Sequence, residues 1–139
     1  MNDRPELLSD EVPPAARMIG RRLLSYDPES GQASLSFLAK PEFSNRHGGV
    51  QGGILAAMLD SAAGATLHAG LGPGLTAVTL QLNTTFLKPA PIGPLSGTAR
   101  LISKDERDAH VEAEILSPEG VVVARATAHL RILKRRQDR

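Results

Sequence analysis

The sequence predicts an α+β domain in which one long apolar helix packs against an antiparallel β-sheet. Between residues 54 and 67, apolar side chains recur every three or four positions, which is the period of a helix. Elsewhere apolar and polar side chains alternate, as in strands, and turns rich in Pro and Gly separate the alternating segments. One central helix against such a sheet is the simplest layering that buries both.

Six segments have the alternation of strands, and in chain order they are residues 18–26, 33–38, 79–86, 95–103, 109–115 and 122–132. Because short turns join most of them, we expect an antiparallel meander. In the third segment the strict alternation puts Thr79 on the face opposite Leu82 and Phe86. We expect residues 1–17 to form a loose lead-in, 18–133 the domain and 134–139 a basic tail.

Composition excludes several classes of protein. A chain of 139 residues suits one domain, and a net charge of +1 with only 3% aromatic residues disfavours nucleic-acid binding. The absence of cysteine excludes disulfides and thiolate chemistry, and it is compatible with the cytoplasm, where we expect the protein. No segment of about 18 apolar residues exists, so no membrane span is expected. The four histidines, His47, His68, His110 and His129, lack metal-ligand spacing, so no metal site is expected.

One carboxylate stands alone in this sequence. Asp60 is the only formally charged residue between Gly48 and Leu87, and it falls within the apolar helix. An isolated carboxylate in apolar surroundings costs free energy, and such groups tend to mark functional sites. The simpler alternative is that Asp60 and Ser61 form a narrow polar stripe that faces water.

The entry to the helix is rich in glycine, with Gly48, Gly49, Gly52 and Gly53 in close succession. The first N–H groups of a helix have no intrahelical partner and carry a partial positive charge. A glycine-rich helix start is therefore a candidate anion or oxyanion site, although this feature alone is weak evidence.

Together these residues are similar to a known family. The signature of hotdog-fold acyl-CoA thioesterases of the PaaI type resembles the run Asn45-Arg46-His47-Gly48-Gly49-Val50-Gln51-Gly52-Gly53 and its continuation to Asp60. Residues 79–90 also look like the family's strand after the helix, and the resemblance extends over residues 18–133. It implies a hotdog fold, in which a curved antiparallel sheet of five or six strands wraps a long central helix. It also implies hydrolysis of an acyl-CoA thioester without a cofactor, because coenzyme A is part of the substrate.

The resemblance further implies the roles of four catalytic residues. Asp60 would be the nucleophile or general base, and Gly52 would donate its N–H to the thioester oxygen. Asn45 would position the attacking water or the acid, and Thr79 would orient that water.

Four further residues are expected to bind substrate. Gln51 stands where the family usually has His, and because Gln cannot titrate we expect it to orient rather than to transfer protons. Gly53 and His47 lie beside the expected site, and Arg46 is a candidate for a coenzyme A phosphate. Arg100, Lys104 and Arg107 are weaker phosphate candidates, because solvated strand ends explain them equally well.

A distance argument predicts that the active unit is a dimer. Gly52 and Asp60 are eight residues apart, which is roughly 12 Å along one helix. Both groups must lie within about 3 Å of one carbonyl to act on it, so they are expected to come from different chains. The resemblance implies the same, because hotdog protomers pair and often pair again into tetramers.

Two other functions on this fold remain open. A non-catalytic acyl-CoA binder or sensor is the first, and the presence of Asp60 counts against it. A dehydratase acting on hydroxyacyl thioesters is the second, but that chemistry needs a catalytic His where Gln51 stands. The sequence does not identify the acyl group.

Overall fold

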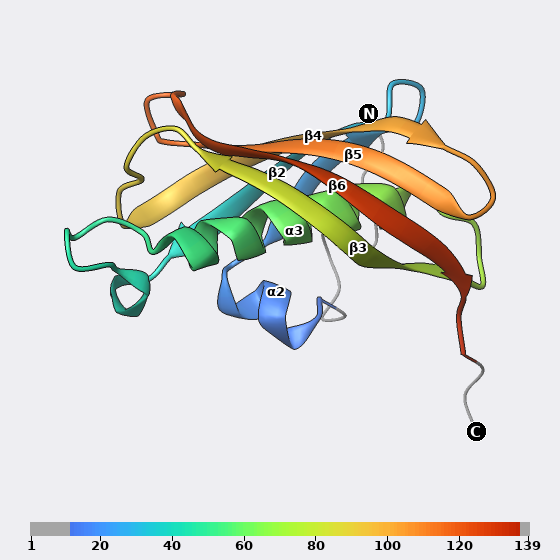
Figure 1. Ribbon diagram of the computed structural model, residues 1–139, viewed down its shortest axis with the longest axis horizontal. Coiled ribbons are helices and arrows are strands. Elements are labelled where there is room, and N and C mark those ends of the chain that lie inside the picture. Colours follow the sequence, from blue (N-terminus) through green and yellow to red (C-terminus); the bar gives the residue numbers. More distant parts are fainter. Residues whose placement is uncertain (1–11, 137–139) are drawn as a thin grey trace.

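In the computed structural model, which describes residues 12–136, a curved six-stranded antiparallel sheet has one long helix lying across its inner face (Figure 1). The elements are α2 Pro14–Met18, β1 Arg22–Asp27, β2 Gln32–Ala39, the short 3-10 helix Pro41–Phe43, α3 Gly52–Ala69, β3 Leu75–Phe86, β4 Gly93–Lys104, β5 Asp108–Leu116 and β6 Val122–Lys134. The predicted helix is therefore present, and all six predicted strands are found within a few residues of their expected ends.

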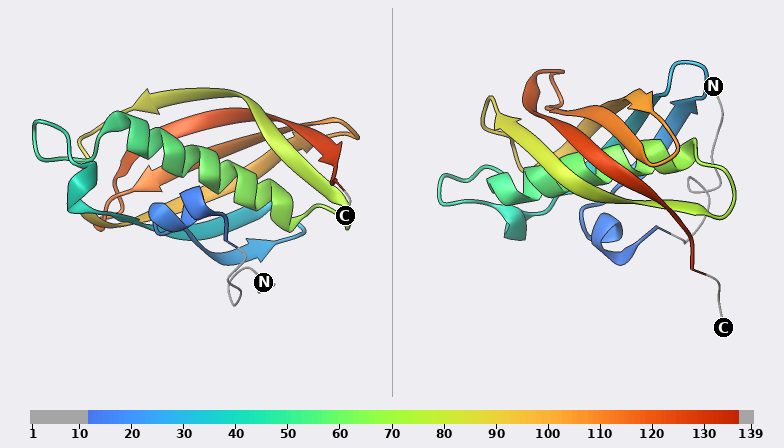
Figure 2. Two further views of the ribbon diagram at one scale, coloured as in Figure 1. Left: turned by 90° about the horizontal axis from the view of Figure 1, so that it is seen from below. Right: turned by 45° about the vertical axis from the view of Figure 1, so that its right-hand side comes forward.

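The core lies between α3 and the inner face of the sheet. Met58 and Leu59 of α3 are fully buried, and they belong to the same cluster as Val111 and Ile115 of β5 and Leu130 of β6. Figure 2 shows α3 running along the sheet, with β3 along one side of it and α2 beside it. Burying a large aliphatic side chain contributes about 1.5–3 kcal/mol, so this layer holds the helix firmly against the sheet.

The strand order is β1-β2-β4-β5-β6-β3. The hairpin β1–β2 and the meander β4–β5–β6 follow the sequence prediction, but β3 does not follow β2 in the sheet. The chain instead passes from β2 through α3, which crosses the sheet, and β3 then pairs with β6 at the far edge. The prediction of a simple meander is therefore wrong at β3, because the helix carries the chain from one side of the sheet to the other.

A β-bulge also changes the predicted faces of β3. Thr79 pairs with Leu130 and Gln81 pairs with His129, so Leu80 is an extra residue in the strand. Leu130 is a core residue, which places Thr79 on the helix side of the sheet. The sequence prediction put Thr79 and Phe86 on opposite faces of the strand, whereas the bulge puts both side chains on the face that meets the helix.

The structure describes part of the predicted lead-in and of the predicted tail. Helix α2 begins at Pro14 and buries Ala16, and strand β1 begins only at Arg22. At the other end the Arg135 N–H donates to the Gly74 carbonyl at 2.7 Å, so the basic segment is attached to the domain there. The rest of the predicted lead-in and tail, residues 1–11 and 137–139, lies outside the described residues. Among the described residues, no helix has the length and apolarity needed to cross a bilayer.

Candidate active site

Asp60 and Thr79 meet where the middle of α3 faces β3. The Thr79 hydroxyl donates to Asp60 Oδ1 at 2.7 Å, which is a short hydrogen bond to a carboxylate. Asp60 is half-buried and Thr79 is exposed, so a molecule bound at this edge of the sheet has access to the pair. Two predicted site residues that lie 19 positions apart in the sequence are thus brought into contact.

The start of α3 lies two turns away from Asp60. Gly52 and Gly53 are the first two helical residues, and no side chain caps this end of the helix. The Gln51 carbonyl accepts the N–H groups of Ile54 and Leu55, at 2.9 and 3.2 Å. No acceptor among the described residues is found for the N–H of Gly52 or Gly53. The helix start therefore offers donors, with the positive end of the helix dipole, to an external acceptor.

Phe86, which the sequence analysis did not assign to the site, covers one side of this helix start. Its ring lies 3.4 Å from the position that a Cβ on Gly52 would take, and 52% of the residue is exposed. The exposed aromatic ring and the Gly52 N–H therefore share one small surface. Its only signal in the sequence was that an aromatic residue, rare in this chain, ended the strand before a proline-rich loop.

The loop before α3 is held by Asn45. Asn45 Oδ1 accepts the N–H of His47 at 2.8 Å and that of Gly49 at 3.2 Å, which closes a tight turn. Gly49 lies close to Ala90, in the loop between β3 and β4. A Cβ on Gly49 would stand only 3.0 Å from the Ala90 carbonyl oxygen. In this geometry Asn45 fixes the loop that leads to the helix start, and its predicted action on water or acid stays a prediction.

The predicted site residues thus fall into two groups within one protomer. Asp60 and Thr79 form the first group. The second group lies in the loop before α3 and at the start of that helix, and it contains Asn45, Arg46, His47, Gln51, Gly52 and Gly53. Because Gly52 and Asp60 belong to one continuous helix, about 12 Å of helix separates the two groups.

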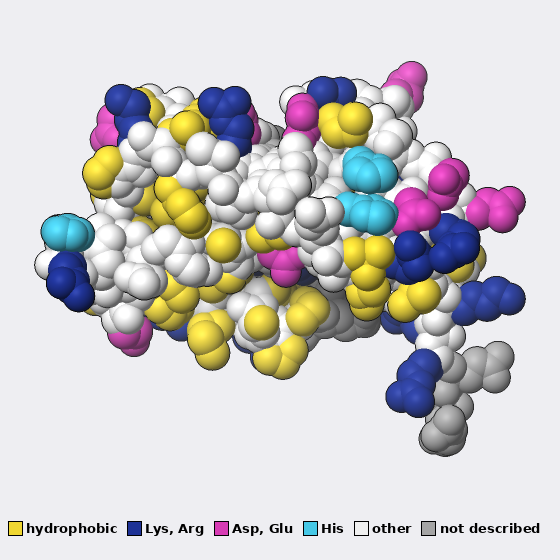
Figure 3. Space-filling view, in the orientation of Figure 1, with side chains coloured by type: hydrophobic (Ala, Val, Ile, Leu, Met, Phe, Trp, Pro, Cys, Tyr) yellow, Lys and Arg dark blue, Asp and Glu magenta, His cyan; other side chains and the backbone are white. Residues whose placement is uncertain are grey.

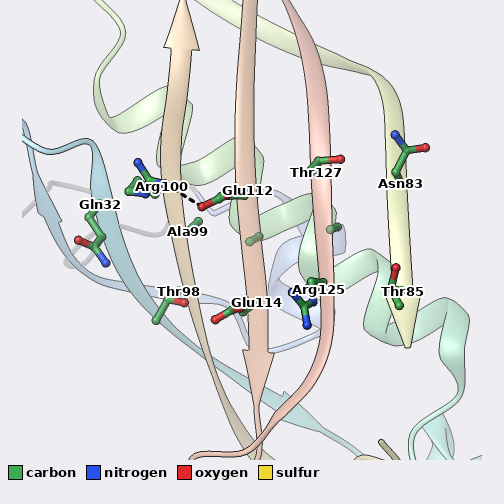
Figure 4. A pocket seen from close by; sticks show the side chains of 12 residues that line it. Gln32, Asn83, Thr85, Thr98, Ala99, Arg100, Glu112, Glu114, Arg125 and Thr127 are labelled. Carbon is green, nitrogen blue, oxygen red and sulfur yellow. Dashed lines mark hydrogen bonds and ion pairs between the residues drawn. The ribbon is translucent and has the colours of Figure 1, made fainter. Parts of the chain in front are cut away.

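The phosphate candidates on the strands lie elsewhere. Arg100 pairs with Glu112 at 2.9 Å on the outer face of the sheet, and Lys104 and Arg107 are exposed at the β4–β5 turn. A hollow of about 400 Å³ also lies on this outer face, lined by charged and polar side chains such as Arg100, Glu114 and Arg125. Figure 4 shows it on the side of the strands away from α3, and none of the predicted catalytic residues lines it.

A charged cluster lies on the outer face where the start of β5 pairs with the last part of β6. Asp108 Oδ1 accepts from His129 Nε2 at 2.8 Å and from Arg131 Nε at 3.0 Å. These hydrogen bonds, first that of His129 and then that of Arg131, hold the pKa of Asp108 below its ordinary value. The His129 ring also stacks on His110 with 4.7 Å between ring centroids. Within residues 12–136, no three His, Asp or Glu side chains gather as metal ligands do.

A second residue that sequence reasoning missed contacts α3 next to Asp60. Arg21 is only 8% exposed, and its Nη1 donates to the Ser61 hydroxyl at 3.1 Å. This hydrogen bond joins the segment between α2 and β1 to the turn of α3 that carries Asp60. Ser61 is therefore hydrogen-bonded to another part of the protein, whereas in a polar stripe that faces water its hydroxyl would bond to solvent.

This arrangement of helix and sheet, with a glycine-rich helix start, matches known proteins. The model of the thioesterase superfamily matches residues 47–124, which is more than half of the chain, and the chain belongs to this family. The protein is accordingly a thioester hydrolase with a hotdog fold of the PaaI-like kind, as the sequence predicted.

Individual relatives agree with this assignment. A Ralstonia eutropha JMP134 structure, provisionally named a thioesterase and phenylacetic acid degradation-related protein, is 37% identical with a TM-score of 0.84; the match covers 90% of this chain and 95% of that one. A Bacillus halodurans protein solved with CoA is 29% identical with a TM-score of 0.69, over 72% of this chain and 66% of that one. A Saccharolobus solfataricus protein provisionally named an esterase is 28% identical, over 76% of this chain and 75% of its own length.

Proposed function

We propose that two copies of the chain form a shared active site that hydrolyses acyl-CoA thioesters to the free acid and CoA. The observation that carries the proposal is the position of Asp60 on α3. This half-buried carboxylate accepts a hydrogen bond from Thr79 of β3, and the N–H-rich start of its own helix lies about 12 Å away. Neither group completes a thioester site within its own protomer. A two-fold axis that brings one copy's Gly52 to the other copy's Asp60 completes two identical sites at once.

The edge strand β3 supports the pairing of two copies. It is 12 residues long and, among the described strands, pairs only with β6, so its outer edge carries unpaired backbone groups. Val78, Leu80 and Phe86 on this strand are 45–52% exposed. Figure 3 shows hydrophobic side chains gathered on the lower half of the molecule, where α2, α3 and β3 lie. A long apolar strand edge of this kind is typically covered by another chain.

In this site the Gly52 N–H of one copy polarises the thioester carbonyl, as a preorganised donor at a helix N-terminus does. Asp60 of the other copy either attacks the carbonyl carbon or removes a proton from a water that does so, while Thr79 holds its carboxylate. The C–S bond then breaks and the CoA sulfur leaves and takes up a proton. The CoA found in the B. halodurans relative supports coenzyme A as the carrier of the acyl group.

The test is hydrolysis of an acyl-CoA panel, followed by detection of the free CoA thiol. We expect turnover by the wild type and a loss of at least ~10²-fold in kcat for Asp60→Asn, with substrate binding retained. Asp105→Asn, which removes a carboxylate from the distant β4–β5 turn, is the matched control and should keep its activity. If the wild type binds acyl-CoA but releases no thiol, the chain is an acyl-CoA binder and the proposal is wrong.

A single turnover in 18O-labelled water tests for direct attack by Asp60. Direct attack by the carboxylate forms a mixed anhydride, and water attacking its aspartyl carbon leaves an unlabelled enzyme oxygen in the first product acid. An unlabelled first product acid therefore identifies Asp60 as the nucleophile, whereas label enters that acid when water attacks the acyl carbon, either of the thioester or of the anhydride.

A further inference from the structure

The turn of α3 that carries Asp60 is joined to both edges of the sheet. Thr79 of β3, at one edge, donates to the Asp60 carboxylate at 2.7 Å. Arg21, which directly precedes the other edge strand β1, donates from Nη1 to the Ser61 hydroxyl at 3.1 Å. Figure 2 shows that β3 and α2, the helix before Arg21, lie on opposite sides of α3. Two neighbouring residues of one helix turn are thus held from two sides.

The backbone around Arg21 is fixed before its side chain reaches α3. The Arg21 N–H donates to the Ala16 carbonyl of α2 at 2.9 Å, and the Leu38 N–H of β2 donates to the Ile19 carbonyl at 3.0 Å. Gly20 has φ +68°, and a Cβ on it would stand 2.8 Å from the Leu38 Cβ. The segment therefore needs glycine at this position and has little freedom to move.

The Arg21 side chain is a costly means of joining α2 to α3. The residue is only 8% exposed, and a guanidinium stays charged at every pH at which proteins are folded. Burying a charge costs free energy, so an apolar side chain would make the same connection at lower cost. The use of a guanidinium here indicates a role beyond packing.

Packing defines the rotation of α3 less well after Asp60 than before it. Met58 and Leu59 are large buried side chains, whereas the next buried residues after Asp60 are Ala62 and Ala63, whose methyl groups present little shape. A Cα lies about 2.3 Å from the helix axis and a carboxylate about twice as far, so a roll of about 10° displaces the carboxylate by roughly 1 Å. A displacement of that size can lower a reaction rate by about 10²-fold. The side-chain hydrogen bonds at this turn therefore help to determine where the carboxylate lies.

We propose that Arg21 is a positioning residue for Asp60, acting through Ser61 from the side of α3 opposite Thr79. The inference rests on the proposed function, because that proposal gives Asp60 its catalytic role. The hydrogen bond from Arg21 to Ser61 prevents the turn from rolling toward or away from β3, so that Thr79 meets the carboxylate in a fixed geometry. Arg21 does not touch the substrate in this role. Its loss should therefore lower kcat and change KM little.

The experiment measures kcat, KM and Tm with the acyl-CoA of the panel that the wild type hydrolyses fastest. We expect Ser61→Ala and Arg21→Met each to lower kcat by about five- to tenfold, with KM changed by less than about twofold. Ser61→Thr keeps the accepting hydroxyl and should retain the wild-type kcat. Ser61→Ala tests the proposal even if Arg21→Met does not fold, because alanine favours the helix.

Thr66→Ala is the control for a general loosening of α3. The Thr66 hydroxyl donates to the Ala62 carbonyl at 2.7 Å, and among the described contacts it is hydrogen-bonded to neither Asp60 nor Ser61. We expect this variant to have a lower Tm and an unchanged kcat. The double variant Arg21→Met, Ser61→Ala should lose no more kcat than the more affected single variant, because both substitutions remove the same hydrogen bond.

A wild-type kcat in Ser61→Ala would overturn the proposal, and so would a loss of kcat in Thr66→Ala as large as that in Ser61→Ala. Additive losses in the double variant would also overturn it, since Arg21 and Ser61 would then act separately. Failure of the proposed function has a different signature, because the wild type would then release no CoA thiol or Asp60→Asn would keep its activity.

Discussion

Thr79 on β3 donates its hydroxyl to Asp60 on α3 at 2.7 Å, and a β-bulge in β3 makes this contact possible. Without the extra residue Leu80, the alternation of the strand would turn Thr79 to the outer face of the sheet, away from the helix. One inserted residue therefore places a hydroxyl group beside the single carboxylate of α3. The bulge lies at an edge strand next to the candidate catalytic residue, which is a common location for such irregularities.

Removing the Thr79 hydroxyl is expected to impair catalysis more than stability. Thr79→Val keeps the shape of the side chain but leaves Asp60 Oδ1 without its donor, so the carboxylate is less firmly oriented. We expect kcat to fall by about tenfold or more, because misplacement of a catalytic group is costly, with KM changed less. Thr79→Ser, which retains the hydroxyl, is the matched control. Steady-state kinetics showing equal activity for the valine and serine variants would contradict a role for this hydrogen bond.

The N–H of Gly52 can be removed without distorting the helix. Proline is favoured at the first helical position, and Gln51, with φ −58° and ψ 134°, already has the conformation required before proline. Gly52→Pro thus deletes the donor, whereas Gly52→Ala retains it and adds a methyl group at ordinary contact distance from Phe86. We expect kcat to fall by about 10²–10³-fold in the proline variant, the usual effect of losing an oxyanion donor.

The alanine variant controls for crowding at the Gly52 position, and circular dichroism controls for the fold. Equal kcat values in the proline and alanine variants would mean that the Gly52 N–H does not contact the reacting carbonyl.

Mixing two inactive variants tests whether the site is shared between copies. In a heterodimer of Asp60→Asn and Gly52→Pro chains, one site combines both defects, and the other combines an intact Gly52 with an intact Asp60. Random mixing makes half of the dimers mixed, so about a quarter of the wild-type activity should return. The measurement is thiol release by the co-expressed chains, which carry different affinity tags and are first assayed as the random mixture.

Purification through both tags isolates the mixed dimers, for which about half of the wild-type activity is expected. If both groups acted within one chain, no mixture would recover activity. An active monomer in sedimentation at assay concentration would contradict the shared site in a second way.

Local patterns predicted much of this structure. The three- and four-residue spacing of apolar side chains identified α3, and the isolated charge of Asp60 marked the candidate catalytic residue. The position of β3 at the far edge was not predictable in this way, because it depends on how α3 crosses the sheet rather than on any local signal.

The bulge at Leu80 was also hidden, since it is defined by pairing with β6, which lies about 50 residues further along the chain. The contact of Phe86 with Gly52 and that of Arg21 with Ser61 likewise join segments distant in the sequence. Spacing within one helix revealed the distance between Gly52 and Asp60, but the side chains that surround each of them depend on tertiary packing.

The last prediction concerns stability and pH at Asp108. Hydrogen bonds from His129 and Arg131 hold its pKa below the ordinary value of 3.8, so the folded protein binds this proton more weakly than the unfolded chain. The stabilisation from this group is therefore complete above that value and is lost as the pH falls through the lowered pKa. Asp108→Asn lacks this contribution at every pH. The Tm of the wild type should exceed that of the variant near neutral pH, and the difference should close as the pH is lowered below 3.8.

Thermal unfolding followed by circular dichroism from about pH 7 to about pH 2.5 measures this difference directly. Glu106→Gln, in the turn just before β5, is the control. It removes a carboxylate that makes no hydrogen bond or ion pair among the described contacts. Its Tm should stay near that of the wild type across the whole range. A Tm difference for Asp108→Asn that persists unchanged at about pH 2.5 would show that the variant acts through packing at the start of β5, and not through the charge of Asp108.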